Sequence, residues 1–184
     1  AYPANPDSEY GWEKLFSERR FFSYARNYGL DVHVARYHNV YAIKGTWRGG
    51  KEKAPAAICR KVAEASERNE YTVEVWGDGL QTRSFLYIDD CVDATIAFTR
   101  SNFPGPLNIG SEEMVSINEL VELVADIASK RVVAKLIPGP LGVQGRTSNN
   151  DLIKEVLGWS PRYSLREGMK LTFEFVSGQV ALNP

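Results

Sequence analysis

Strand-like and helix-like segments alternate along most of this chain, and that alternation limits its fold more than any other feature. Apolar residues at helical spacing predict helices over residues 10–27, 54–68, 89–99, 117–128, 148–157 and 165–180. Short runs rich in β-branched and aromatic residues predict strands over 31–37, 72–76, 83–88, 106–109 and 132–137. Such alternation is typical of proteins with a largely parallel sheet. We therefore expect an α/β fold.

Some of the predicted helix ends carry recognisable signals. Ser116 is followed three residues later by Glu119, which is the spacing of a capping box and predicts a helix start. Gly29 is expected to end the first helix, and Asp89 or Asp90 is expected to cap the helix that follows them. The residues expected on the buried side of the first helix are Leu15, Phe16, Phe22 and Tyr24.

Composition argues against several classes of partner. The chain has 22 lysines and arginines and 23 aspartates and glutamates. Because these charges are nearly balanced, the chain has no bulk attraction to nucleic acid or to a membrane surface. No apolar run approaches the ~20 residues of a transmembrane helix, and the first residues lack the basic and apolar regions of a signal peptide. We expect a cytosolic protein in which Cys59 and Cys91 are reduced thiols within the core.

A tyrosine and a lysine lie four residues apart in the segment Tyr10-Gly-Trp-Glu-Lys14. On an α-helix this spacing puts both side chains on one face. A lysine ammonium beside a tyrosine hydroxyl stabilises the phenolate, so the tyrosine can act as an acid or base near neutral pH. The spacing also arises by chance, and the alternative is an ordinary solvated pair that adds little to helix stability.

One glycine-rich stretch, Gly139-Pro-Leu-Gly-Val-Gln-Gly145, nearly has the spacing of a dinucleotide-binding turn. Pro140 removes an amide that a pyrophosphate would need. The next predicted helix begins only near Ser148, and the acidic residue Asp151 follows too soon to bind a ribose. We expect this stretch not to bind a dinucleotide. Since no other segment offers a phosphate cradle, the sequence is expected to be the carboxyl-terminal half of a longer enzyme.

Several stretches carry a resemblance to a known family: Arg36-Tyr-His-Asn-Val-Tyr41, Gly45-Thr-Trp-Arg-Gly-Gly-Lys-Glu-Lys-Ala-Pro-Ala-Ala57, Cys59-Arg-Lys61, Trp76-Gly-Asp-Gly-Leu-Gln-Thr-Arg-Ser-Phe85 and Asn108-Ile-Gly-Ser111. Over most of its length the sequence resembles the nucleotide-sugar epimerases and dehydratases of the extended short-chain dehydrogenase family. The resemblance implies the carboxyl-terminal part of a Rossmann-type doubly wound sheet plus a smaller substrate-binding domain. Residues 1–52 would end the dinucleotide-binding domain, and residues 53–184 would be mainly the substrate-binding portion, interleaved with the sheet.

The resemblance also implies a mechanism that uses NAD. In this family the cofactor takes a hydride from C4 of the sugar while a tyrosine removes the hydroxyl proton. Here Tyr10 would be that tyrosine, and Lys14 would hold the cofactor ribose. The C4 ketone acidifies the hydrogens on C3 and C5, so that an acid and a base on opposite ring faces can invert both carbons. Lys53 matches the family's lysine acid, and the matching cysteine would lie before residue 1. The expected substrate is GDP-mannose.

The same resemblance assigns a set of residues to the nucleotide sugar. Arginine and lysine suit a negatively charged diphosphate, and the expected substrate contacts are Asn39, Glu52, Lys53, Ala54, Lys61, Gln81, Thr82, Arg83 and Arg146. Without the resemblance, each charged residue would more simply be a solvated surface group, and Asn39 could merely close a turn. His38 is interpreted as a structural donor beside the site rather than a catalytic base. No metal ligands are assigned.

The sequence leaves two other functions open. A sugar-nucleotide 4-epimerase or 4,6-dehydratase would lack the lysine acid, and a non-catalytic sugar-nucleotide-binding module would bind its ligand without reacting. The family usually has Gly-Pro-Phe where this chain has Ala42-Ile43-Lys44, a change that alters the turn beside the sugar. The resemblance also suggests a homodimer. Because these residues offer no cradle for the cofactor, they are expected to be inactive by themselves.

Overall fold

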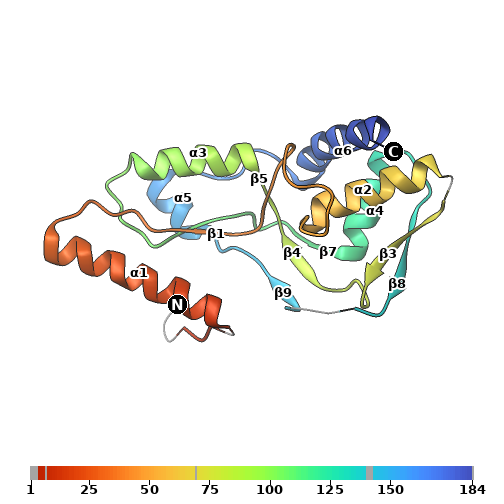
Figure 1. Cartoon of the computed structure of the whole chain (residues 1–184). Coiled ribbons are helices and arrows are strands. Elements are labelled where there is room, and N and C mark those ends of the chain that lie inside the picture. Colours follow the sequence, from red (N-terminus) through yellow and green to blue (C-terminus); the bar gives the residue numbers. More distant parts are fainter. Residues whose placement is uncertain (1–3, 7, 69, 140–142, 184) are drawn as a thin grey trace.

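The computed structural model describes the chain except for residues 1–3, 7, 69, 140–142 and 184 (Figure 1). The helices are α1 (Glu9–Tyr28), α2 (Ala54–Glu67), α3 (Ile88–Thr99), α4 (Ile117–Ile127), α5 (Asp151–Leu157) and α6 (Leu165–Leu182). The strands are β1 (Ala35–Tyr37), β2 (Val40–Tyr41), β3 (Thr72–Trp76), β4 (Thr82–Ser84), β5 (Leu86–Tyr87), β6 (Leu107–Ile109), β7 (Met114–Ser116), β8 (Val133–Ile137) and β9 (Gly145–Arg146). The predicted alternation and the α/β fold class are confirmed. Within the described ranges, none of the helices is both long enough and apolar enough to span a membrane.

Most paired strands run parallel. β1 pairs with β6, β2 with β5, β3 with β8 and β4 with β9 in the parallel direction, whereas β4 and β7 are antiparallel. Parallel strands need a crossover connection, and at least one helix separates the two members of each parallel pair in the sequence. In Figure 1, α1 lies at one end of the molecule and the β3–β8 pair at the other.

Two clusters of buried apolar side chains hold these elements together. The larger cluster joins α2, α4 and α6 to the strands beside them and includes Val62, Leu120 and Met169, each fully buried. The smaller cluster joins α3 and α5 to β6 and includes Leu107 and Ile153. Burying side chains of this size contributes about 1.5–3 kcal/mol each, so these clusters are the main source of the fold's stability.

Both cysteines are free and buried, as predicted. Cys59 belongs to the larger cluster and Cys91 to the smaller. Burial raises the pKa of Cys59 to about 12 and also raises the pKa of Cys91. The thiolate is the reactive form of cysteine, so both residues serve packing rather than chemistry.

Helix α1 has the predicted ends but less of it is buried than expected. The Ser8 hydroxyl accepts a hydrogen bond from a backbone amide of the first turn, and Gly29 ends the helix at φ 66°, a conformation that glycine adopts readily. Phe16 and Tyr24 are 62% and 42% exposed, so their predicted burial is wrong. The reason is that α1 contacts the rest of the described chain along a narrow face, on which only Glu18 is fully buried.

An ion pair attaches α1 to β1. The Arg36 guanidinium donates hydrogen bonds to both carboxylate oxygens of Glu18 at 2.7 and 2.8 Å, and the Glu18 side chain is 8% exposed. Bidentate pairs of this kind fix direction as well as distance. Lys14 precedes Glu18 by about one turn of the helix, so it lies on the side of α1 that faces β1.

Helix α3 begins differently from the prediction. Tyr87 is at the N-cap position and makes no side-chain cap, so the expectation that Asp89 or Asp90 caps the helix is wrong. Asp90 is instead bound to a distant segment, where its carboxylate accepts hydrogen bonds from the backbone amides of Arg162 and Tyr163 at 3.0 and 2.9 Å. The Asp90 side chain therefore binds a distant part of the chain instead of capping the helix that contains it.

Two other elements are shorter than predicted. Of residues 31–37, only 35–37 form a strand, because the pairing partner β6 is itself that short. Helix α5 begins at Asp151 rather than at residue 148. The Ser148 hydroxyl donates to the Asn150 side chain, and the Asn150 amide donates to the Gly110 carbonyl, which holds this segment out of the helix.

Replacing Asp90 by alanine is expected to lower the free energy of unfolding by about 3 kcal/mol, because two backbone amides would lose their acceptor at a site that is closed to water. Asp90 is fully buried. Urea denaturation measures the change. The control is Asp126→Ala, which breaks an exposed pair with Arg166 and should cost less than about 1 kcal/mol. Equal losses in the two variants would contradict this explanation.

Candidate functional site

A cavity of about 810 Å³ is lined by the loop before α2, by α2 itself and by β3 and β4. Small-molecule sites commonly have volumes of about 300–1,000 Å³. Seven of the nine expected substrate contacts line it, although they come from distant parts of the sequence. They are Asn39, Glu52, Lys53, Ala54, Lys61, Gln81 and Arg83. The other two, Thr82 and Arg146, lie on the paired strands β4 and β9.

Positive charge gathers where β4 and β9 pair. The register places Arg83 directly opposite Arg146. The Arg83 guanidinium donates hydrogen bonds to the carbonyls of Thr82 and Val143. Burial, followed by the charge of Arg146, lowers the pKa of Arg83. Two guanidinium groups this close repel each other, and an anionic ligand between them would relieve the repulsion.

Lys61 adds positive charge on the wall of the same cavity. Its ammonium donates a 2.6 Å hydrogen bond to the carbonyl of Glu74 on β3. An ammonium has three donors, so Lys61 can bind a ligand while it keeps this bond. The bond to β3 also fixes the direction in which the long side chain extends.

Lys53 lies at the junction of two cavities. It lines the large cavity and also a smaller one of about 220 Å³ that extends toward Tyr41 and Thr46. It is the N-cap residue of α2, and its side chain makes no capping hydrogen bond. The residue is exposed. An exposed ammonium at the edge of a cavity is in a position to give a proton to a bound ligand.

The Glu52 side chain is more buried than is expected of a residue that contacts the substrate. It is only 7% exposed, and Arg60 donates a 2.9 Å hydrogen bond to it. Burial by itself raises the pKa of Glu52, but the backbone amides of Glu52 and Gly50 together with Arg60 outweigh burial and hold that pKa below its ordinary value. The carboxylate is therefore charged at neutral pH.

The lowered pKa of Glu52 predicts an acid-sensitive contribution to stability. A carboxyl group whose pKa is lower in the folded state stabilises the protein at a pH above its ordinary pKa of 4.5, and this contribution is lost as the pH falls through the folded-state value. The difference in unfolding free energy between the wild type and Glu52→Gln should therefore be largest at neutral pH and should shrink below pH 4.5. Urea denaturation from neutral to acid pH tests this. A difference that stays constant over the range would contradict it.

Asn39 links β2 and β5 beside the cavity. The side-chain amide of Asn39 donates to the backbone carbonyl of Ser84 at 3.1 Å, and the backbone carbonyl of Asn39 accepts from the backbone amide of Leu86 at 2.9 Å. His38 is partly buried, and burial, followed by the charge of Arg146, lowers its pKa. Its imidazole is therefore neutral at pH 7. Among the described residues, His38 Nδ1 has no hydrogen-bond partner.

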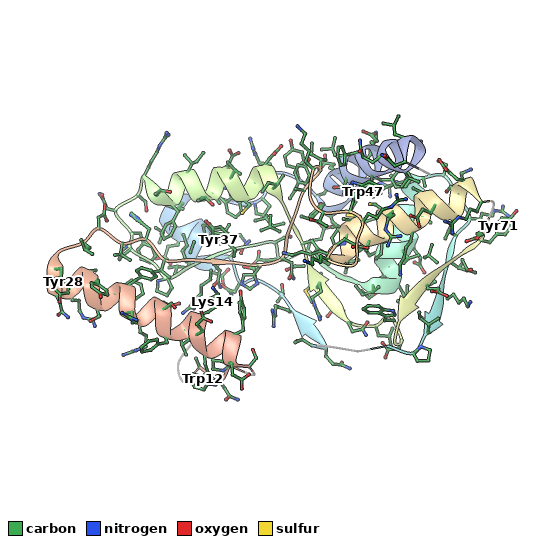
Figure 2. The ribbon with its side chains drawn as sticks, in the orientation of Figure 1. Trp12, Lys14, Tyr28, Tyr37, Trp47 and Tyr71 are labelled. Carbon is green, nitrogen blue, oxygen red and sulfur yellow. The ribbon has the colours of Figure 1, made fainter. Side chains whose placement is uncertain are left out.

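Tyr10 and Lys14 lie together but outside the cavity. The Lys14 ammonium is 5.2 Å from the centroid of the Tyr10 ring, as the helical spacing predicts. Tyr10 is 70% exposed, and neither residue lines the large cavity. Figure 2 shows Lys14 on the side of α1 toward the strands and Trp12 on the opposite side. The helix brings the two side chains together, and the exposed Tyr10 side chain is accessible to another molecule.

The described residues do not form a complete dinucleotide cradle, which needs a strand, a tight glycine turn and a helix in succession. Gly77 and Gly79 have positive φ, but they form the turn between two strands. Gly49 and Gly50 also have positive φ, but they lie in the long loop between β2 and α2. The stretch 139–145 lies partly outside the described residues.

Among the cavity residues that the sequence reasoning missed, Arg60 and Trp76 have side chains suited to a role in the site. Arg60 lines the cavity and pairs with Glu64 one turn along α2, a spacing that is visible in the sequence. Its second partner, Glu52, becomes apparent only in the fold. Trp76 is 58% exposed and lines the cavity. It was recognised only as part of a motif, although an exposed ring at a cavity wall offers a surface for stacking.

The model of the NAD dependent epimerase/dehydratase family matches residues 1–110. The chain is 48% identical over 180 residues to GDP-mannose 3,5-epimerase of Arabidopsis thaliana, an alignment that covers 98% of this chain and 47% of that protein. It is 32% identical to UDP-glucuronic acid decarboxylase 3 of the same plant, over 94% of this chain and 48% of that protein. The chain thus spans about half the length of the curated relatives it matches.

Solved structures share the fold. A UDP-glucose 4-epimerase of Thermotoga maritima, determined with UDP-glucose, superposes with a TM-score of 0.85 at 31% identity, over 96% of this chain and 55% of that one. A UDP-glucose 4-epimerase of Thermus thermophilus, determined with NAD, gives a TM-score of 0.80 at 25% identity, over 96% of this chain and 56% of that one.

Proposed function

The chain belongs to the NAD-dependent epimerase/dehydratase family, and from this membership we propose that it forms the sugar-nucleotide site and part of the catalytic set of a GDP-mannose 3,5-epimerase. The observation that carries the proposal is the convergence of seven expected substrate contacts on one cavity. Sequence identity of 48% to GDP-mannose 3,5-epimerase, against 32% to a UDP-glucuronic acid decarboxylase, favours this substrate.

The basic residues bind the diphosphate of the nucleotide sugar. Arg83 and Arg146 are opposed across two strands, and Lys61 extends along the cavity wall. Guanidinium forks match phosphate oxygens in pairs, and a lysine contributes a movable charge. With the diphosphate there, the sugar extends toward Lys53, and Trp76 offers the nucleotide base a ring to stack on.

The chemistry divides between two groups of residues. Bound NAD supplies the oxidation of C4 by accepting its hydride. Tyr10 removes the C4 hydroxyl proton, and Lys14, whose ammonium lies 5.2 Å from the centroid of the Tyr10 ring, holds the cofactor ribose. The C4 ketone makes the hydrogens on C3 and C5 acidic. Lys53 then donates a proton to the ring carbon from its own face, and the resemblance assigns removal of the opposite proton to a cysteine before residue 1.

We also propose that the chain consists of two functional parts. Residues 1–52 complete a dinucleotide-binding domain, and residues 53–184 are mainly the substrate-binding portion. We also propose that the whole protein is cytosolic and forms a homodimer. The aromatic residues that α1 leaves exposed, among them Phe16, Tyr24 and Tyr28, offer apolar area that a second copy or the NAD-binding half would cover.

The test uses GDP-mannose labelled with tritium at C3 or C5. Residues 1–184 by themselves should bind the sugar nucleotide and release no tritium, because the residues that the structure describes do not form a complete cofactor cradle. Joined to the NAD-binding half of the Arabidopsis relative, the same residues should release tritium from both positions. Release from neither position, with hydride transfer intact on UDP-glucose, would identify a 4-epimerase instead. Binding without any chemistry in the joined protein would identify a non-catalytic module.

A further inference from the structure

A single arginine joins helix α2 to the loop that precedes it. Each nitrogen of the Arg60 guanidinium has its own acceptor. Nε donates to the Trp47 carbonyl at 3.2 Å, and the two terminal nitrogens donate to Glu52 at 2.9 Å and to Glu64 at 3.0 Å. The Arg60 and Glu52 side chains are only 18% and 7% exposed. Two of these acceptors belong to the loop and one to α2.

A second arginine holds the same loop against α6. The Arg48 guanidinium donates to the Asn183 carbonyl at 3.0 Å, lies 3.6 Å from the Glu64 carboxylate and is 5.0 Å from the centroid of the Trp47 ring. Figure 2 shows Trp47 where the loop meets α2 and α6. Glu64 therefore connects both arginines, and the loop is fixed to two helices.

The loop needs such attachments because its backbone is intrinsically free. Gly49 and Gly50 have φ values of 104° and 81°, and glycine loses more conformational freedom on ordering than any other residue. Lys53 follows Glu52 directly, so whatever fixes Glu52 also fixes the point from which the Lys53 side chain extends. A displacement of about 1 Å at a reacting group can cost about 100-fold in rate.

We propose that Arg60 and Glu52 are positioning residues that form a clasp, which fixes the loop to α2 and places Lys53 at the cavity edge. In this proposal Glu52, one of the expected substrate contacts, acts on the loop through Arg60, and Lys53 is the residue that contacts the ligand. Only the role given to Lys53 rests on the proposed function. Lysine in place of Arg60 would keep the charge, but one ammonium cannot reach three acceptors arranged around a planar group.

Hydrogen exchange of the loop amides, residues 45–53, tests the clasp in this chain without any ligand. Arg60→Met should speed exchange of these amides by about tenfold or more, as local opening becomes easier, and Arg60→Lys should fall between that variant and the wild type. The matched control is Arg166→Met, which breaks an exposed ion pair on α6 and should leave the loop unchanged. If Arg60→Met exchanges like the wild type, the clasp is refuted.

Titration with GDP and with GDP-mannose tests the positioning role. GDP affinity should stay within about twofold in Arg60→Met, because Lys61, Arg83 and Arg146 keep their partners. GDP-mannose affinity should fall by about tenfold or more, as expected when a hydrogen bond from a charged group is lost, and Arg60→Lys should recover part of it. Equal losses for both ligands would show a general disturbance and overturn the proposal.

Two further results separate the possible failures. If Arg60→Met does not fold, Glu52→Gln provides the second variant, since it keeps the shape of the side chain and weakens the same clasp. Faster loop exchange in Glu52→Gln supports the proposal, and unchanged exchange refutes it. If the wild type binds GDP but not GDP-mannose, the proposed substrate is wrong, while the exchange result still decides the clasp.

Discussion

Replacing Lys53 by alanine is expected to lower the formation of sugar nucleotide inverted at C3 and C5 from GDP-mannose by about 100- to 10,000-fold, the usual contribution of a positioned acid or base. The physical reason is that Lys53 is the ammonium at the edge of both cavities, so its loss removes the proton donor on that side of the ring. Hydride transfer at C4 depends on Tyr10 and should continue. The measurements are the amount of C3- and C5-inverted product and the formation of NADH, both in the protein that carries the NAD-binding half.

The matched control for Lys53 is Lys130→Ala, which removes an exposed lysine that lines neither cavity. It should leave both reactions within about twofold, as is usual for an exposed surface residue. If Lys53→Ala retains full inversion of C3 and C5, Lys53 is not the acid. If it loses hydride transfer and inversion together, the lysine acts on binding or on the loop as a whole.

Replacing Arg83 by methionine is expected to weaken GDP binding by about 3 kcal/mol, or about 100-fold, because charge-assisted hydrogen bonds to the diphosphate would be lost. The methionine keeps much of the apolar stem, so packing changes little. Arg83 is held beside Arg146 by the strand register, and Arg146→Met should weaken the same ligand in the same direction. Calorimetric titration of this chain with GDP measures both variants.

Arg131→Met is the control for Arg83, since Arg131 is exposed and does not line the cavity. It should leave GDP affinity unchanged. The affinity should also fall with added salt in the wild type and less steeply in Arg83→Met, because part of the attraction is electrostatic. Binding of GDP that is insensitive to Arg83 would place the diphosphate elsewhere.

Features set by neighbouring residues could be predicted from the sequence. The capping box of Ser116 and Glu119 is present as predicted, because both partners lie within one turn of the helix. The second helix that begins with a serine and a glutamate three residues later, Ser164 and Glu167, is capped in the same way. Gly29 ends α1 for an equally local reason.

Features that depend on distant partners could not be predicted. The aromatic residues of α1 follow the spacing of a buried helix face, but Phe16 and Tyr24 have little in the described chain to cover them. Asp90 lies where a cap is expected and instead binds the backbone at Arg162 and Tyr163. Helical periodicity identifies an apolar face and says nothing about what packs on it.

The candidate site likewise combines residues that the sequence indicated with contacts that depend on the fold. The set of nine substrate contacts came from the resemblance, since no single arginine or lysine among them stands out from a solvated surface residue. Their convergence on one cavity is a property of the fold. The Arg60–Glu52 pair was missed because its partners are joined only when the loop folds back on α2. The roles of the individual site residues stay predictions that the variants above test.

The central claim is that this cavity binds a sugar nucleotide by its diphosphate. Calorimetric titration of residues 1–184 with GDP-mannose tests it most directly. The account predicts saturable binding at one site, displaced by GDP and strongly weakened in Arg83→Met. Absence of binding at millimolar GDP-mannose, or binding that Arg83→Met leaves unchanged, would contradict the claim.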